Sequence, residues 1–511
     1  MIKKLPLVCL NLLLALAAFC GGFEIKTSTI MDQPDVTVLG HYKGSWYAIG
    51  FELPGNLNKP PRYKIYKYAA GFGSGKTSVL YPSFGEKTYY IRAGFVGGKL
   101  SLFYARCEKR TDEESMLDNR DGHQVMPMIY RQDYDLNTLE PAGEAQLIFD
   151  EKESYFSSSG IEIAESPDRS KTAVLIKPWY KLLKYKVVIT DNNTGVSSEK
   201  TFDFKLLKEY LKFLQLSVNN NGQVFLAARV RDDVISLAPT RKDKPQNIYY
   251  LFSFNKESTE PVQTEIHSPV TKGKYLSDPL MTILNNGEML LSNDYYADEK
   301  RQNFQGVSLT RYNEALSATA KRDVTPDAKF LPDVTAYRPV KKGQEFAHLQ
   351  TVKLLPLEGA NFMLLTEYRD TAVNNQKGLP CVKERGYLLT CRIDESLSAK
   401  AQHVIYKKQL SSTVDYAFSA QAGRRGNEVY LFYNADWEED GEHSMNLMLT
   451  RLPADGGAAA TTKIVNTSGD FFTGMQAIYP GAANKFMFSE MKLVDYGDVA
   501  REVKLLEITV K

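Results

Sequence analysis

One pattern recurs along the whole chain and constrains its fold more than any other feature: a short polar or glycine-containing turn followed by an apolar, β-type segment. Residues of these types tolerate the positive φ angles that tight β-hairpin turns require. The pattern therefore predicts a chain built from repeated antiparallel hairpins. The turns are Lys43-Gly44, Gly97-Gly98-Lys99, Asp168-Arg169-Ser170, Asn220-Asn221-Gly222, Asn285-Asn286-Gly287, Glu358-Gly359-Ala360, Arg425-Gly426-Asn427 and Ala483-Asn484.

Each turn belongs to a longer unit. A short apolar strand precedes most of the turns, and a third and a weaker fourth strand follow the second, as in residues 279–324. The unit is a four-stranded antiparallel meander that repeats about eight times. One meander cannot bury both of its faces alone, so neighbouring units must pack against each other. The one helical pattern, residues 204–214, carries apolar residues three and four apart and predicts a helix in a connection.

This architecture resembles that of β-propellers over nearly the whole chain. The resemblance implies an all-β fold with seven or eight four-stranded antiparallel blades. Residues 474–511 supply three strands, and a strand within residues 23–39 would supply the fourth and close the ring. The chain lacks the Trp-Asp dipeptide of WD repeats, the glycine pairs of Kelch repeats and the Asp-box of sialidases, so no specific family is indicated. Two stacked sandwiches or a solenoid are the alternatives. The predicted buried positions of successive blades are Val174, Phe225, Met289, Phe362, Val429 and Phe486.

The first twenty residues form a separate segment. Lys3 and Lys4 precede an apolar run that ends at Cys20, the layout of a secretory signal peptide, and the run is short for a membrane span. We therefore expect a signal peptide at residues 1–20 and a single β-propeller domain at residues 21–511. The expected location is the periplasm, the cell surface or the extracellular space. An uncleaved anchor is one alternative; acylation of Cys20 is another, which Phe19 disfavours because a small residue is expected there.

The amino-acid composition limits the classes of partner that this chain can bind. Lys and Arg total 63 and Asp and Glu total 61, so no basic field exists to neutralise nucleic-acid phosphates. No other run is apolar and long enough to cross a membrane as a helix. If the signal peptide is cleaved after Cys20, only Cys107, Cys381 and Cys391 remain, which are too few for a disulfide framework. Cys381 and Cys391 could pair across a loop, or they could be buried thiols. The expected partner is a protein or a glycan.

The connection between the second and third strands of each unit is long, whereas the turn between the first and second is tight. Length beyond the hairpin minimum is not needed for folding, and rigid scaffolds often carry binding groups on such loops. Aromatic residues beside Arg or Asp suit protein or glycan recognition. The predicted ligand-binding residues in these connections are Trp179, Tyr180, Asp294, Tyr295, Tyr296, Tyr368, Arg369, Asp370, Asp436 and Trp437.

The sequence predicts no catalytic, metal or cofactor motif. Residues 70–77 match a relaxed phosphate-loop pattern, but Pro82 and β-type residues follow where that motif needs a helix. The six histidines are scattered, and the acidic segment 111–122 lacks the alternating spacing of a calcium loop. The sequence favours a binding scaffold. An enzyme acting on a polysaccharide or glycoconjugate, with a site assembled from several blades, and an accessory subunit of an outer-membrane or secretion assembly remain the alternatives.

Overall fold

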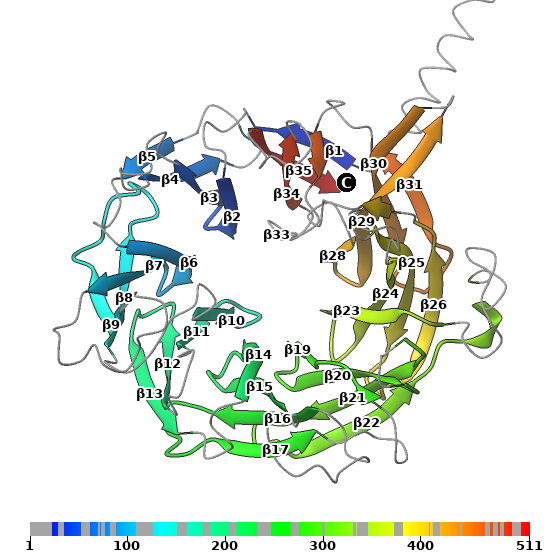
Figure 1. Ribbon diagram of the computed structural model, residues 1–511, viewed down its shortest axis with the longest axis horizontal. Coiled ribbons are helices and arrows are strands. Elements are labelled where there is room, and N and C mark those ends of the chain that lie inside the picture. Colours follow the sequence, from blue (N-terminus) through cyan, green and yellow to red (C-terminus); the bar gives the residue numbers. More distant parts are fainter. Residues whose placement is uncertain are drawn as a thin grey trace, which may run out of the picture. The chain divides into compact units, whose positions relative to one another are not determined.

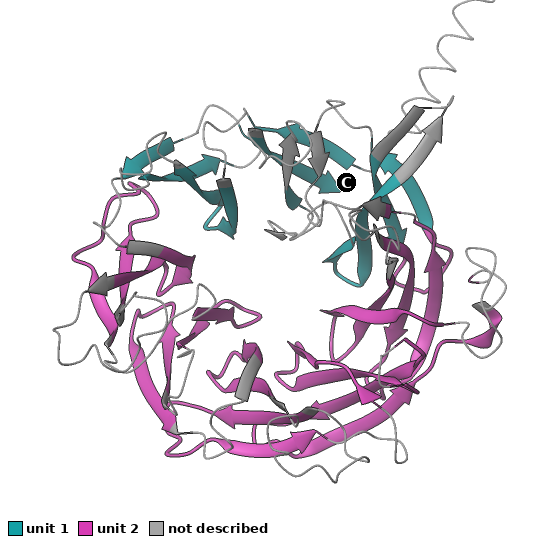
Figure 2. Cartoon of the chain, viewed as in Figure 1, with its two compact units in different colours: residues 1–82, 413–452, 460–511 teal, residues 83–412, 453–459 magenta. Residues whose placement is uncertain are grey.

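A computed structural model describes most of the chain after residue 22. The described residues are 23–28, 35–52, 62–69, 72, 77–81, 88–108, 126–150, 161–176, 184–203, 211–231, 247–266, 275–298, 302–330, 334, 346–372, 382–407, 409–411, 420–439, 442–464, 471–473, 479–480, 485–492 and 502–510. Within these residues the strands form eight antiparallel sheets (Figure 1). The chain divides into two compact units, which Figure 2 colours separately: unit 1 is Met1–Pro82, Thr413–Leu452 and Ala460–Lys511, and unit 2 is Ser83–Ser412 and Pro453–Ala459.

Unit 2 holds five sheets in which each strand pairs mainly with its neighbour in sequence. The first sheet is β6 (Thr88–Val96), β7 (Lys99–Glu108), β8 (Met126–Tyr134) and β9 (Gln146–Asp150). The second is β10 (Ile161–Glu165), β11 (Lys171–Ile176), β12 (Lys184–Asp191) and β13 (Ser197–Asp203). The third is β14 (Leu211–Val218), β15 (Val224–Arg231), β16 (Asn247–Phe254) and β17 (Val262–Ile266).

The fourth and fifth sheets of unit 2 each contain one extra short strand. The fourth is β18 (Tyr275–Leu276), β19 (Leu280–Ile283), β20 (Met289–Tyr296), β21 (Phe304–Tyr312) and β22 (Ala318–Val324), and a 3₁₀ turn, η4 (Ala328–Phe330), follows it. The fifth is β23 (Leu349–Pro356), β24 (Phe362–Ala372), β25 (Val382–Ile393), β26 (Ala399–Ile405) and β27 (Gln409–Ser411). Within unit 2, β6, β10, β14, β19 and β23 lie on the inner side of an arc, and β9, β13, β17, β22 and β26 lie on the outer side (Figure 1).

Unit 1 holds the other three sheets. One is β2 (Asp35–Tyr42), β3 (Ser45–Glu52), β4 (Arg62–Ala69) and β5 (Thr77–Tyr81). Another is β28 (Ala420–Arg425), β29 (Glu428–Glu439), β30 (Glu442–Leu452) and β31 (Ala460–Ile464). The last combines β1 (Phe23–Thr27) with β32 (Phe471–Thr473), β33 (Tyr479–Pro480), β34 (Lys485–Lys492) and β35 (Glu502–Val510). The fold is an all-β, eight-bladed β-propeller, which confirms the predicted class at the upper of the two blade numbers.

The last sheet joins the two ends of the chain. β1 pairs with β35 from Phe23↔Val510 to Thr27↔Leu506, so the N-terminal segment supplies the outer strand, as predicted. The indole nitrogen of Trp46 on β3 donates to the buried carboxylate of Glu507 on β35 at 2.8 Å, and the Lys485 ammonium lies 3.0 Å from the same carboxylate. A buried carboxylate is stable only when it is paired in this way.

The predicted turns have a clear local cause. At the β14–β15 turn the Asn219 carboxamide oxygen accepts hydrogen bonds from the backbone nitrogens of Asn221 and Gln223 at 3.0 and 2.9 Å. Gly222 follows with φ +86°, a conformation that residues with a side chain rarely adopt. Asparagine and glycine therefore specify the hairpin, and the flanking apolar residues specify the strands.

The core lies between the faces of consecutive sheets. One cluster of buried residues joins the β10–β13 and β14–β17 sheets, a second joins β14–β17 to β18–β22, and a third joins β18–β22 to β23–β27. The predicted core positions Val174, Phe225, Met289, Phe362, Val429 and Phe486 are all buried, with at most 2% of their surface exposed. Each sheet in these clusters therefore stabilises its neighbour, as expected of a repeat that cannot bury both faces alone.

Three local predictions have different outcomes in the structure. The predicted helix at residues 204–214 is wrong at its end, because residues 211–214 belong to β14; residues 204–210 lie outside the described residues. Thr77 begins β5, so no helix follows the phosphate-loop-like segment. Cys391 is a buried free thiol whose pKa burial raises to about 12. Its proposed partner Cys381 and the signal peptide at residues 1–20 lie outside the described residues.

Candidate functional site

The predicted ligand-binding residues belong to the end of each sheet at which the second strand leads to the third, here named the 2–3 end. Most of these connections lie outside the described residues, including the one that carries Trp179 and Tyr180. Eight of the ten predicted residues are described, all of them in strands rather than in loops. The expectation that these eight lie in loops is therefore wrong. Their role in ligand binding stays a prediction.

Asp294, Tyr295 and Tyr296 are the last three residues of β20, and each has at most 3% of its surface exposed. Tyr295 pairs with Gly306 on β21, where a Cβ atom would lie 2.6 Å from the Tyr295 hydroxyl oxygen. The ring thus occupies the space that a side chain at position 306 would need. Burial, together with the nearby charge of Asp323, raises the pKa of Tyr295 to about 12. Tyr295 and Tyr296 therefore complete the sheet instead of projecting from it.

The Asp294 carboxylate connects two sheets. It accepts hydrogen bonds from the backbone nitrogen of Thr351, at 2.8 Å, and from the Thr351 hydroxyl, both on β23. The Tyr296 hydroxyl lies 3.3 Å from the same carboxylate and 3.1 Å from the Leu349 carbonyl oxygen. Burial raises the pKa of Asp294 to about 6, against the opposing effects of these hydrogen bonds and of Arg369.

The stability of the fold should therefore depend on the ionisation of Asp294. Because its pKa is higher in the folded state than in the unfolded state, folding favours the protonated form, and stability should fall as the pH rises from about 4 to about 6. Relative to Asp294→Asn, the free energy of unfolding of the wild type should fall by about 3 kcal/mol over this interval. The reason is that a tenfold change in proton affinity corresponds to about 1.4 kcal/mol. Urea denaturation at a series of pH values measures the difference.

The exposed Glu257→Gln variant is the control for the loss of a carboxylate, and it should change stability by less than about 0.5 kcal/mol at each pH. If the free energies of unfolding of wild type and Asp294→Asn differ by a constant amount from pH 4 to 7, this carboxylate is ionised throughout that range.

Tyr368, Arg369 and Asp370 lie in β24 near its 2–3 end. Tyr368 is buried and stacks on Tyr387 with ring centroids 5.6 Å apart. Its hydroxyl lies 3.3 Å from Asp370, and the His348 ring nitrogen Nδ1 lies 3.4 Å from the same carboxylate. Tyr368 thus packs within the core, while Asp370 and Arg369 are only half-buried.

A buried ion pair beside Arg369 was not predicted from the sequence. The Glu367 carboxylate accepts hydrogen bonds from Lys407 and, at 2.7 Å, from Arg369, and the Lys407 ammonium also donates to Gln409 at 2.7 Å. The side chains of Glu367 and Lys407 are fully buried. Burial raises the pKa of Glu367, but the positive charges of Lys407 and Arg369 outweigh this effect and lower it. Burial lowers the pKa of Lys407 to about 8, although Glu367 opposes this.

Asp436 and Trp437 lie in β29, which continues to Glu439, and β30 begins at Glu442. The predicted long loop is therefore a tight connection between two long strands. Five cross-strand pairs, from Ala435↔Asn446 to Glu439↔Glu442, extend beyond the positions at which β28 and β31 pair with these strands. Among the described residues this stretch, here named the β29–β30 ribbon, has no third strand on either edge.

Neither a metal site nor a membrane-spanning helix is found in the part of the chain that the structure describes. No three His, Cys, Asp or Glu side chains of those residues are placed to hold a metal ion together. No helix formed by those residues is long and apolar enough to span a membrane.

Comparison with known proteins identifies no family for this chain. No family model matches the chain, and no curated protein sequence matches it. The β-propeller domain of the trilobed protease from Pyrococcus furiosus is 10% identical, with a TM-score of 0.34 over 82% of this chain and 98% of that one. The WD40 domain of SCAP from fission yeast is 6% identical, with a TM-score of 0.43 over 96% and 94%. A europium-containing methanol dehydrogenase is 8% identical, with a TM-score of 0.41 over 95% and 93%. Similarities this low carry no conclusion about this chain.

Proposed function

We propose that this chain is an exported binding scaffold that recognises a protein or a glycan through the 2–3 ends of its blades. Export is inferred from the signal-peptide pattern of residues 1–20. The observation that carries the binding proposal is the β29–β30 ribbon, because its length is not needed to complete a four-stranded blade.

The ribbon offers two means of recognition. From Asp436 to Glu439 and from Glu442 to Met445, its edges carry backbone N–H and C=O groups that pair with no other described strand, and such edges can accept a strand from a partner. The segment also contains Trp437 among the acidic residues Asp436, Glu438, Glu439, Asp440 and Glu442. Tryptophan is a frequent anchor of binding interfaces, and clustered carboxylates favour a partner with basic groups.

Within unit 2, buried polar networks fix strands near two other 2–3 ends. Asp294 holds β20 to β23 through Thr351, and Glu367 holds β24 to the segment at Lys407. When strand ends are already fixed, less conformational entropy is lost on binding. Trp179 and Tyr180, in another 2–3 connection, belong to the same proposal.

Replacement of Trp437 tests the proposal. Trp437→Ala should weaken binding to the partner by about 30-fold, which corresponds to about 2 kcal/mol for an interface anchor. It should change the free energy of unfolding by less than about 1 kcal/mol if the side chain leaves no cavity. Binding of the purified chain to immobilised envelope polysaccharides and surface proteins, followed by biolayer interferometry, measures the first quantity, and chemical denaturation measures the second.

Val196→Ala is the matched control, because Val196 is an exposed apolar residue, 69% exposed, in the turn between β12 and β13 at the opposite end of its blade. It should leave binding unchanged. If Trp437→Ala strongly destabilises the protein and leaves binding intact, Trp437 belongs to the core and the proposal loses its principal residue.

A further inference from the structure

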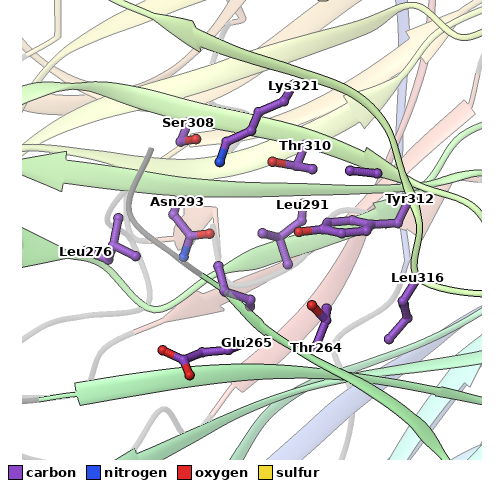
Figure 3. A pocket seen from close by; sticks show the side chains of 12 residues that line it. Thr264, Glu265, Leu276, Leu291, Asn293, Ser308, Thr310, Tyr312, Leu316 and Lys321 are labelled. Atoms are coloured by element: carbon purple, nitrogen blue, oxygen red, sulfur yellow. The ribbon is translucent and has the colours of Figure 1, made fainter. Parts of the chain in front are cut away.

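A pocket of about 300 Å³ opens between β17 and the β18–β22 sheet in unit 2 (Figure 3). Alternation along the strands brings its polar lining to one face. Leu291 on β20 pairs with Thr310 on β21, which pairs with Lys321 on β22, and the neighbouring row pairs Asn293 with Ser308. Figure 3 shows these side chains on one side of the pocket, with Thr264 and Glu265 on the strand that faces them.

Two buried polar groups in this lining have unused hydrogen-bonding capacity. Ser308 is 6% exposed, and its hydroxyl makes no hydrogen bond to any residue that the structure describes. Asn293 is 2% exposed; its amide nitrogen donates to the Ser277 carbonyl at 3.2 Å, and its amide oxygen accepts no hydrogen bond from the described residues. The Ser308 hydroxyl and the Asn293 amide oxygen are not enclosed by protein, so a ligand in the pocket can bond to both.

Two groups of opposite charge also line the pocket. Lys321 on β22 pairs with Thr310, and Glu265 lies on β17, the strand that faces this sheet. The pocket therefore has no strong electrostatic preference. This arrangement favours a neutral ligand with several hydroxyl groups, which can donate to a carboxylate and accept from an ammonium.

The rest of the lining is apolar. Leu276, Leu291 and Leu316 contribute aliphatic surface and Tyr312 contributes an aromatic ring. A volume of about 300 Å³ lies at the lower end of the range for small-molecule pockets, about 300–1,000 Å³. A pocket with an apolar, partly aromatic wall and a row of hydroxyl, amide and ammonium groups is suited to a small molecule with one apolar and one polar face.

We propose that this pocket binds one neutral sugar residue, either free or at the end of a glycan. The sugar hydroxyls bond to Ser308, Asn293 and Lys321, and the C–H face of the ring packs on Tyr312 and the leucines. This site goes beyond the proposed function, because it shares no residue with the β29–β30 ribbon and lies between two neighbouring sheets.

The test uses four probes, the methyl glycosides of glucose, galactose, mannose and N-acetylglucosamine, at millimolar concentration. At least one should bind the wild type, as measured by saturation-transfer NMR and calorimetry. Ala318→Trp should weaken that binding by about tenfold or more, because Ala318 is exposed at the pocket, opposite Tyr312, and an indole there would fill the cavity. Ser308→Ala should weaken it about fivefold through the loss of one hydrogen bond.

Thr319→Trp is the matched control, because Thr319 is the exposed neighbour of Ala318 on β22 and its hydroxyl donates to Glu288, outside the pocket lining. It should leave the affinity unchanged. The proposal is overturned if none of the four glycosides binds the wild type, or if a folded Ala318→Trp variant binds as the wild type does. If Ala318→Trp does not fold, unchanged affinity in Ser308→Ala overturns it. Trp437→Ala should retain sugar binding, so failure of the scaffold proposal and failure of this one are distinguishable.

Discussion

Replacing Phe362 by alanine should lower the free energy of unfolding by about 3–5 kcal/mol, the range observed when large aromatic side chains are removed from protein cores. Phe362 begins β24, is fully buried and pairs with Pro356 on one side and Ile393 on the other. It belongs to the cluster that joins the β18–β22 and β23–β27 sheets, so the cavity would open between two blades. A chain of two compact units need not unfold in one step. The midpoint and the slope of the chemical unfolding transition should therefore both be measured.

Val262→Ala provides the comparison, because Val262 is apolar, lies on the outer strand β17 and is 49% exposed. It should change stability by less than about 0.5 kcal/mol. A cost below about 1 kcal/mol for Phe362→Ala would mean that the contact between these two blades contributes little to the fold.

Removing the positive charge of Lys407 should cost about 3–5 kcal/mol, because Lys407→Met leaves the fully buried Glu367 carboxylate without its nearest counter-charge. The double variant Glu367→Gln with Lys407→Met should be more stable than Lys407→Met alone by about 2 kcal/mol or more. The reason is that desolvation of two charges nearly offsets their attraction, so a neutral pair of similar size is tolerated better than one unpaired charge. Chemical denaturation of the two single variants and the double variant gives the coupling between them.

The control for these three variants is Lys400→Met in the same sheet. Lys400 pairs with Asp394 at 2.8 Å, but its side chain is 58% exposed, so its loss should cost less than about 1 kcal/mol. Strictly additive effects of the Glu367 and Lys407 substitutions would show that the two side chains do not act as a pair in the folded protein.

The sequence alone determined the architecture, because the information for it is local. Turns such as Asn220-Asn221-Gly222 require no distant contact to reverse the chain, and the apolar segments that flank them define strands wherever they fall. The need of each meander to bury two faces then determines that blades pack on blades, and a deficit of one strand at the C-terminus indicated that β1 would pair with β35.

Tertiary structure decided where strands end and which polar residues meet. Asp294, Tyr295 and Tyr296 follow an apolar run, and nothing local distinguishes a loop from a strand whose polar residues are satisfied by β23 of the next blade. The residues of the Glu367–Lys407 pair are 40 positions apart, and those of the pocket come from β17 to β22. The apolar residues in the segment 204–214 have helical spacing, but residues 211–214 belong to β14, which pairs with β15. Ion pairs and pockets depend on register between strands and on packing between sheets, and these are set only when the whole sheet has formed.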